Sequence, residues 1–385
     1  MIGAGPGGLA AAAMLKERGV PVVVLERDAI GASWRRHYDR LHLHTVRWLS
    51  HLPGLRFNRA HGRWVHRDGV VRYLESYVRH HGLDVRLGVD VRKLDRAADD
   101  SGWVIHTTDG PIHARAVVVA TGYNRIPFIP DWPGKETFEG ELLHGQDYRN
   151  GESYRGRDVL VVGSGNTGAE IALDLVEHGA GRVRMAVRTP PNIVLREANG
   201  VPSQVTGLLM RKLPPRIGDP LAAATRKLVI GDLSGHGLPD PPVGLLTNFL
   251  SNDVVPIIDV GTIEMIRQGK IEVVGGVTGF DGRAVQLADG SSIEPDAVVS
   301  CAGYQRGLEP IVGHLGLLGA KGRPTVHGPN TAPNAPDLHF IGFTNPISGM
   351  FREFGIDAKK IARVQAQRRR SGAAAPIAQR EAAHA

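Results

Sequence analysis

The residues best suited to chemistry in this sequence are two clusters of glycines, and the first begins almost at the start of the printed chain. Gly3, Gly5 and Gly8 have the spacing G-x-G-x-x-G. At that spacing the first glycine permits a tight turn, the second lets a pyrophosphate approach the backbone, and the third lets a helix pack closely on a strand. An apolar strand then ends at Glu26, where a carboxylate can hold a ribose hydroxyl. The residues predicted to bind this dinucleotide also include Pro6, Gly7 and Arg27.

Only two residues precede the first glycine, whereas such a loop normally follows a strand. This leaves two interpretations open, a shortened first strand or a printed start that lies downstream of the natural one. In either case we expect a weakened sheet edge and phosphate loop, so the retention of the nucleotide becomes a question for experiment.

The second glycine cluster follows the buried apolar run at residues 159–162. Gly163, Gly165 and Gly168 repeat the same spacing, and a helix and a strand follow them. Arg188 lies about 20 residues after Gly168, where domains that bind NADH carry an acid. Because a guanidinium pairs well with a 2′-phosphate, the sequence favours NADPH here, although a surface arginine at a strand end is the alternative. The predicted contacts of this nucleotide also include Ser164, Asn166 and Thr167, of which the last two have helix capping as a second role.

Two further strands end in a glycine turn, which suggests points where the chain crosses between domains. The first ends at Ala120-Thr121-Gly122 and the second at Gly303-Tyr304, and all five residues are predicted to lie beside a cofactor.

The end of the chain repeats the change from strand to helix. Gly342 follows a short apolar strand and is predicted to contact a cofactor, and a helix is predicted from about Gly355 to Gln367. We expect residues 368–385, which are rich in Ala and Arg, to form a disordered tail.

Composition excludes several classes of protein. The 385 residues carry a net charge of +7, but the basic residues are scattered and accompany no nucleic-acid-binding motif. Cys301 is the single cysteine, so an intramolecular disulfide, a CxxC redox pair and a cysteine zinc site are excluded. The histidines have no metal-ligand spacing, so no metal is predicted. With no signal peptide and no membrane-spanning stretch, we expect a soluble, cytoplasmic protein.

A further motif in the segment between the two glycine clusters indicates a family. Phe138, Gly140, His144 and Tyr148 match F-x-G-x-x-x-H-x-x-x-Y, and Gly31-Ala32-Ser33-Trp34 is similar to G-G-x-W. The chain resembles the flavin-containing monooxygenases, which are class B flavoprotein monooxygenases. Its final segment resembles that of the plant YUCCA-type enzymes and their bacterial relatives.

The resemblance implies an α/β fold of two Rossmann-like dinucleotide-binding domains, with the second inserted into the first. We expect residues 1–150 and 301–367 to form the FAD-binding domain. Residues 151–300 would form the NADPH-binding domain, with a lid-like segment at about 190–260.

The function implied by the resemblance is that of an NADPH- and O₂-using monooxygenase, which acts through a C4a-(hydro)peroxyflavin on a small organic substrate. An aromatic 2-oxo acid such as indole-3-pyruvate is favoured, and N- or S-oxygenation of an amine, a sulfide or a natural-product intermediate is an alternative. Baeyer–Villiger oxidation of a ketone ranks third, because those enzymes usually carry Trp where this chain has Tyr148. A different FAD/NAD(P)H oxidoreductase and a chain deficient in FAD remain as other classes.

The resemblance also suggests roles for single residues. His144 would link nucleotide binding to domain geometry or would only hold the backbone of its own segment. Trp34 would cover the flavin or fill the core. The expected partners are a small-molecule substrate and O₂, without nucleic acid or membrane, and a homodimer is the assembly to test.

Overall fold

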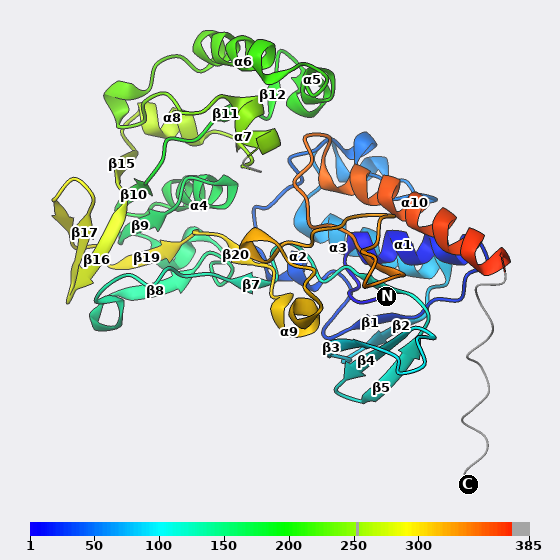
Figure 1. Cartoon of the computed structure of the whole chain (residues 1–385). Coiled ribbons are helices and arrows are strands. Elements are labelled where there is room, and N and C mark those ends of the chain that lie inside the picture. Colours follow the sequence, from blue (N-terminus) through cyan, green and yellow to red (C-terminus); the bar gives the residue numbers. More distant parts are fainter. Residues whose placement is uncertain (252–253, 372–385) are drawn as a thin grey trace. The chain divides into compact units, whose positions relative to one another are not determined.

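The computed structural model describes residues 1–251 and 254–371, and its elements are shown in Figure 1. The chain forms two compact units. The first unit comprises residues 1–35, 47–126 and those from Tyr304 onward, and the second comprises residues 36–46 and 127–303. These limits differ from the predicted ones at 150 and 300, because strand β8 (Glu141–His144) pairs with strand β19 (Ala297–Ser300) of the second unit.

The first unit contains a parallel sheet in which Ile2 takes the place of a central strand. Strand β1 (Val24–Glu26) pairs with β2 (Val85–Leu87), and β6 (Val117–Val119) pairs with β21 (Leu338–Phe340). Ile2 forms parallel bridges with both Leu25 and Val119, and so it joins the two pairs. The residues before the first glycine loop therefore contribute a one-residue bridge to the sheet.

Two helices of the first unit lie against each other beside this sheet (Figure 1). Helix α1 (Pro6–Glu17) buries a run of alanines, and its partner is helix α10 (Met350–Arg370). Helix α10 is longer than predicted at both ends. It begins after Gly349, which has a positive φ, and its last turn carries arginines that favour the helix C-terminus. Residues 368–370 of the predicted disordered tail are therefore helical, and residues 372–385 lie outside the described residues.

The remaining elements of the first unit surround the parallel sheet and its helices. The larger ones are α2 (Ala32–Arg36), α3 (Arg67–His81), α9 (Glu309–Val312) and an antiparallel sheet of β3 (Val91–Arg96), β4 (Trp103–Thr107) and β5 (Gly110–Ala114).

The second unit is built on a parallel sheet of five strands. Their order is β15 (Ile271–Gly275), β10 (Arg182–Val187), β9 (Asp158–Val162), β19 and β8. Strands β9 and β19 are almost wholly buried, as expected for parallel strands covered on both faces. Helix α4 (Asn166–Glu177) follows β9 and packs against β10.

The segment predicted to be lid-like has secondary structure of its own. Strand β11 (Ile193–Leu195) pairs with β14 (Ile257–Asp259) in parallel, and β12 (Glu197–Ala198) pairs with β13 (Val201–Pro202). The described part of this segment also contains three α-helices, α5 (Ser203–Met210), α6 (Pro215–Val229) and α7 (Leu245–Ser251), and a 3-10 helix at Ser234–His236. Antiparallel strands β16 (Val277–Asp281), β17 (Ala284–Leu287) and β18 (Ser292–Ile293) lie outside it.

Candidate functional site

The first glycine loop in the first unit has the geometry of a phosphate cradle. Gly3 has φ +105°, and a Cβ there would lie 2.5 Å from the carbonyl oxygen of Ala120. A Cβ at Gly8 would lie 2.0 Å from the oxygen of Gly3. A Cβ at Gly5, by contrast, would meet no atom within 4 Å. Two of the glycines therefore let the backbone pack closely, whereas Gly5, the N-cap of α1, faces open space that a phosphate can enter.

The carboxylate of Glu26 is directed at this loop. Its Oε2 accepts a hydrogen bond of 2.7 Å from the backbone N–H of Ala4, and its Oε1 accepts one of 3.0 Å from that of Asp28. Glu26 thus has a structural role in addition to the predicted contact with a ribose. Arg27, the next residue, is exposed.

The turn after β6 lies beside the same loop. The hydroxyl of Thr121 is buried and has no hydrogen-bond partner among the described residues. A buried hydroxyl is costly to leave unpaired, so this atom is a natural contact for a polar ligand group. Gly122 follows with φ +96° and open space on its Cβ side.

The second loop, in the second unit, repeats this geometry residue for residue. Gly163 has φ +116°, and a Cβ there would lie 2.7 Å from the carbonyl oxygen of Cys301. A Cβ at Gly168 would lie 2.0 Å from the oxygen of Gly163, and a Cβ at Gly165 would meet nothing within 4 Å. Gly165 is the N-cap of α4, so the helix N-terminus again faces the open side. The two loops are equivalent cradles, one in each unit.

The side chain of Asn166 has a different role from the predicted helix cap. No side chain caps α4, and the side chain of Asn166 instead hydrogen-bonds the backbone at the start of β14. Its Oδ1 accepts from the backbone N–H of Ile258 at 2.6 Å, and its Nδ2 donates to the carbonyl of Pro256 at 3.1 Å. Ser164 and Thr167 stay at the loop, and neither side chain has a hydrogen bond to a described residue.

The strands after the two helices end in side chains of opposite charge. Glu26 is the last residue of β1, and Arg188 directly follows β10. Arg188 is exposed, and its guanidinium has no hydrogen bond or ion pair with any described residue. Its stem packs near Gly276, where a Cβ would lie 3.2 Å from that of Arg188. The guanidinium of Arg188 can therefore pair with a 2′-phosphate.

His144 is buried at the end of β8 and is held through both ring nitrogens. Nδ1 accepts a hydrogen bond of 3.0 Å from the backbone N–H of Gln146. The proton therefore resides on Nε2, which lies 3.0 Å from the carbonyl oxygen of Gly303 and donates to it. Burial lowers the pKa of His144, which keeps the ring neutral. The histidine joins its own segment to the residue that precedes Tyr304, where the chain leaves the second unit.

Aromatic side chains gather near the first turn of α10 in the first unit. Trp34 is half-buried and meets Phe351 edge-on, with ring centroids 6.0 Å apart. The ring of Phe354 covers two glycines, because a Cβ at Gly342 would lie 2.9 Å from it and a Cβ at Gly7 would lie 3.2 Å from it. These glycines are needed for close packing as much as for ligand access.

A buried polar cluster on α4 was missed by the sequence reasoning. Glu170 and Asp174 are both buried, and residues of the segment 36–46 pair with them. His44 Nε2 lies 2.8 Å from Glu170, and the buried Tyr38 bonds the same carboxylate. Burial, and then the charge of Glu170, raises the pKa of Tyr38. The segment is thereby fixed on the helix that begins at the second glycine loop.

The linker motif is tied to the same helix. The hydroxyl of Tyr148 donates to Asp174 at 2.6 Å, and burial raises the pKa of Tyr148. A tryptophan in place of Tyr148 has no hydroxyl to make this bond.

The remaining sequence predictions concern sulfur and metals. Burial raises the pKa of the Cys301 thiol to about 12, so the sulfur is neutral and unsuited to nucleophilic chemistry. Within residues 1–251 and 254–371, no three side chains of the metal-binding types come together. None of the helices in these ranges combines the length and apolarity that a bilayer crossing requires.

Comparison with known proteins places the chain in a family. The family described as pyridine nucleotide-disulphide oxidoreductase matches residues 1–198. Indole-3-pyruvate monooxygenase YUCCA1 of Oryza sativa subsp. japonica is 36% identical over 349 residues, which cover 89% of this chain and 86% of the relative. Probable indole-3-pyruvate monooxygenase YUCCA9 of Arabidopsis thaliana is 35% identical over 353 residues, or 89% of this chain and 83% of the relative.

The chain belongs to the flavin monooxygenases of this family. It is an oxidoreductase of the monooxygenase type, and the cofactors of the family are FAD and NADPH. The solved flavin-containing monooxygenase of Stenotrophomonas maltophilia has a TM-score of 0.71 at 23% identity, covering 94% of this chain and 97% of the other. That likeness shows a shared fold.

Both cradles fit the cofactors of a flavin monooxygenase. Each offers an open glycine at a helix N-terminus, where unpaired N–H groups favour a diphosphate. The first adds the unpaired hydroxyl of Thr121, and the second adds the unpaired cation of Arg188.

Proposed function

We propose that this flavin monooxygenase binds FAD in the first unit and NADPH in the second, and uses O₂ to oxygenate a small organic substrate. Support comes from two cradles of equal geometry that differ in charge at the strand end. Glu26, fixed by Ala4 and Asp28, suits the uncharged ribose hydroxyls of FAD. Arg188 suits the 2′-phosphate by which NADPH differs from NADH.

Bound FAD supplies the redox chemistry, because it accepts two electrons from NADPH and activates O₂. The residues of the chain bind and orient the cofactors. Gly5 and Gly165 admit the diphosphates, and Thr121 offers its hydroxyl to the first of them. His144 holds Gly303 in place by a neutral hydrogen bond, and so it positions the chain without itself moving a proton.

We further propose that the substrate is an aromatic 2-oxo acid that undergoes oxidative decarboxylation. Two relatives above 30% identity carry the name indole-3-pyruvate monooxygenase, one of them as a probable assignment. A panel of one 2-oxo acid, one amine, one sulfide and one ketone decides between this class and the alternatives. Oxygenated product should form in proportion to NADPH consumed with the 2-oxo acid. Formation of hydrogen peroxide alone with all four would refute a monooxygenase reaction on these classes.

Nucleotide preference tests the assignment of the second cradle. Replacing Arg188 by Gln removes a charge-assisted contact worth about 1.5–3 kcal/mol, which raises the KM for NADPH by roughly 10- to 100-fold. The KM for NADH should change less than about twofold. Arg182→Gln, at the other end of the same strand, is the matched control, because Arg182 pairs with Glu272. Equal effects of Arg188→Gln on the two nucleotides would contradict the phosphate contact.

A further inference from the structure

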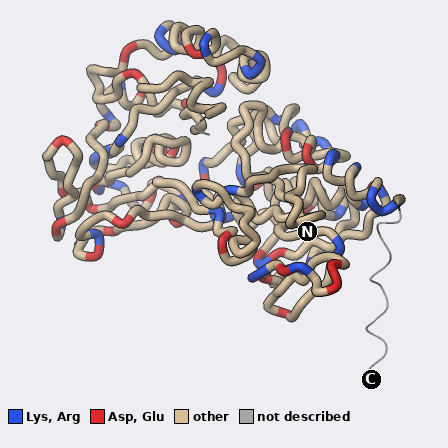
Figure 2. Tube along the Cα trace, viewed as in Figure 1, with Lys and Arg blue, Asp and Glu red and all other residues tan. Residues whose placement is uncertain are grey.

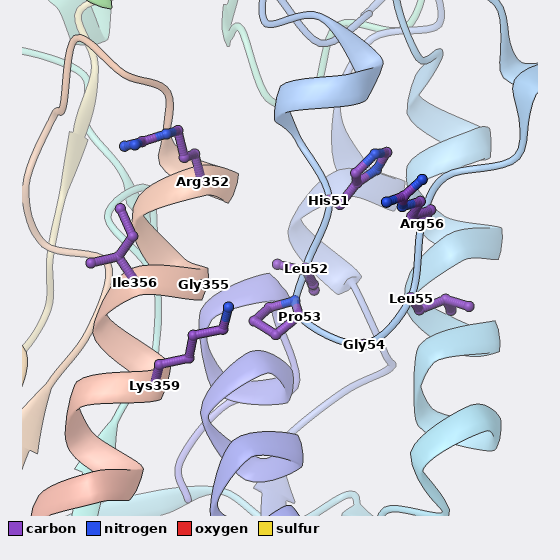
Figure 3. Close-up of a pocket in the computed structure, with 10 residues that line it drawn as sticks. All are labelled: His51, Leu52, Pro53, Gly54, Leu55, Arg56, Arg352, Gly355, Ile356 and Lys359. Carbon is purple, nitrogen blue, oxygen red and sulfur yellow. The ribbon is translucent and has the colours of Figure 1, made fainter.

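A pocket of about 470 Å³ lies in the first unit between the loop at residues 51–56 and helix α10 (Figure 3). This volume is within the range of small-molecule sites. The described function gives this pocket no role. Neither glycine loop contributes to its lining, and neither does any other residue predicted to bind a cofactor.

Hydrogen bonds to helix α3 hold the loop that forms one wall. Tyr73 and Tyr77 of α3 hold the loop through their hydroxyl groups. The hydroxyl of Tyr73 accepts a hydrogen bond from the N–H of Leu52 and donates one to the carbonyl of Leu55, each at 2.8 Å. The hydroxyl of Tyr77 donates to the carbonyl of Pro53 at 2.6 Å. Gly54 completes the turn with φ +86°. A preorganised wall of this kind reduces the entropy lost on binding.

The loop and the helix meet at one close contact. A Cβ at Gly355 would lie 3.2 Å from the ring of Pro53, so the glycine allows the loop to rest directly on α10. This contact explains the buried glycine in the middle of a helix. It also fixes the distance between the two walls, and the pocket opens beside it (Figure 3).

The charge of the lining is uniformly positive or neutral. Arg56 and Lys359 stand on opposite walls, and neither has a hydrogen bond or ion pair with a described residue. Figure 3 shows the side chain of Lys359 extending towards Pro53, and Arg56 beside His51. None of the described residues that line the pocket is an Asp or a Glu. Figure 2 shows both basic and acidic residues along α10.

His51 adds a neutral donor to the same wall. Its Nδ1 accepts a hydrogen bond of 3.1 Å from the N–H of Phe57, so its proton is on Nε2. Burial, and then the charges of Arg56 and Arg47, lowers the pKa of His51. Apolar contacts are provided by Pro53, Leu55 and Ile356. Cations without partners beside apolar surface match a small molecule with a carboxylate and an apolar body.

We propose that this pocket binds a small organic carboxylate, with Arg56 and Lys359 facing the carboxylate and Pro53 and Leu55 facing the apolar body. The site extends beyond the proposed function, since it makes no use of the cofactor cradles. A 2-oxo acid and the shorter acid left by its decarboxylation share this chemistry.

Calorimetric titration of the FAD-loaded protein tests the proposal without turnover. Phenylpyruvate and phenylacetate represent the two sources of ligand, and the tighter of them identifies the source. Phenylacetamide, which has the same shape without the charge, should bind at least about fivefold more weakly than phenylacetate. Binding of phenylacetate should also weaken as salt is raised, because exposed charges are screened.

Three variants locate the binding on the protein. Arg56→Met and Lys359→Met should each weaken phenylacetate binding at least about fivefold. Lys360→Met is the matched control, because Lys360 is an exposed cation on the same helix that does not line the pocket. Equal effects of Lys359→Met and Lys360→Met would overturn the proposal, as would equal affinity for the acid and the amide or no binding of either acid. These outcomes do not depend on oxygenation, so they are separate from failure of the proposed reaction.

Discussion

His144 offers the sharpest test of how the linker motif acts, because its two hydrogen bonds can be removed one at a time. Phe has no polar ring atom, so His144→Phe leaves the N–H of Gln146 unpaired. It also removes one of the two hydrogen bonds that the carbonyl of Gly303 accepts, the other coming from the N–H of Phe128 at 3.1 Å. The amide oxygen of Asn can replace Nδ1, so His144→Asn keeps the bond to Gln146. The amide nitrogen of Gln can replace Nε2, so His144→Gln keeps the bond to Gly303.

The expected magnitudes follow from burial. His144 is 3% exposed, and a buried group left unpaired costs about 1–3 kcal/mol. The Gln variant, which leaves the N–H of Gln146 unpaired, should therefore lose about 2 kcal/mol of unfolding free energy. The Asn variant, in which Gly303 keeps its bond from Phe128, should lose about 1 kcal/mol, and the Phe variant about 3 kcal/mol. For a unit of this size that corresponds to a fall in Tm of about 9 °C for Phe, about 6 °C for Gln and about 3 °C for Asn.

The assay combines thermal unfolding with nucleotide kinetics. Gly303 follows Cys301 closely in the chain, and the carbonyl of Cys301 lies under Gly163 of the second cradle. If His144 acts through Gly303, the Asn variant should raise the KM for NADPH several-fold, whereas the Gln variant should leave it near the normal value. Unchanged Tm values in all three variants would refute the reasoning. Equal KM values in the Asn and Gln variants would show that the histidine only holds its own segment.

Three further predictions concern the cradles and the response to acid. Gly168→Ala should destabilise the protein by several kcal/mol, because its Cβ would meet the oxygen of Gly163 at 2.0 Å. Gly165→Ala, whose Cβ meets nothing within 4 Å, should keep the normal Tm and weaken NADPH binding. Equal losses of Tm in the two variants would contradict this. Glu26→Gln weakens a charge-assisted bond to the first loop, so FAD should dissociate more readily, as measured by flavin released on gel filtration, with retention at the normal level as the opposing result. Burial lowers the pKa of His144 and His339 below 6.5, so the unfolded chain binds these protons before the folded protein does as the pH falls. The free energy of unfolding should therefore decline below about pH 6.5, by at most about 1.4 kcal/mol per pH unit for each histidine. Urea denaturation that gives the same free energy between pH 6.5 and 5 would argue against this.

The tight turns of the two glycine loops could be predicted from the sequence because their geometry is local, whereas the nucleotide contacts of these loops stay predictions. The positive φ of Gly3 and Gly163, and the close contact that Gly8 and Gly168 permit, involve residues only a few positions apart. Spacing alone therefore carries the information. The same holds for the charges at the strand ends, since the helix between loop and strand has a nearly fixed length.

The limits of the two units could not be predicted in the same way. Residues 36–46 lie in the second unit because Tyr38 and His44 reach Glu170. That pairing joins residues more than a hundred positions apart, and a carboxylate inside a helix gives no sign in the sequence of its partner. The role of Asn166 escaped for the same reason, because its partner Ile258 follows a long intervening segment.

The sequence by itself thus determined the form of the two glycine loops and the charge at the strand end beside each, and from these it predicts how a dinucleotide is held. Only the tertiary structure decided which buried groups find partners. It left Thr121 unpaired beside the first cradle, and it placed Arg56 and Lys359, which are distant in the chain, across one pocket. The physical reason is that burial and pairing depend on contacts between distant segments, whereas loop geometry depends on neighbours.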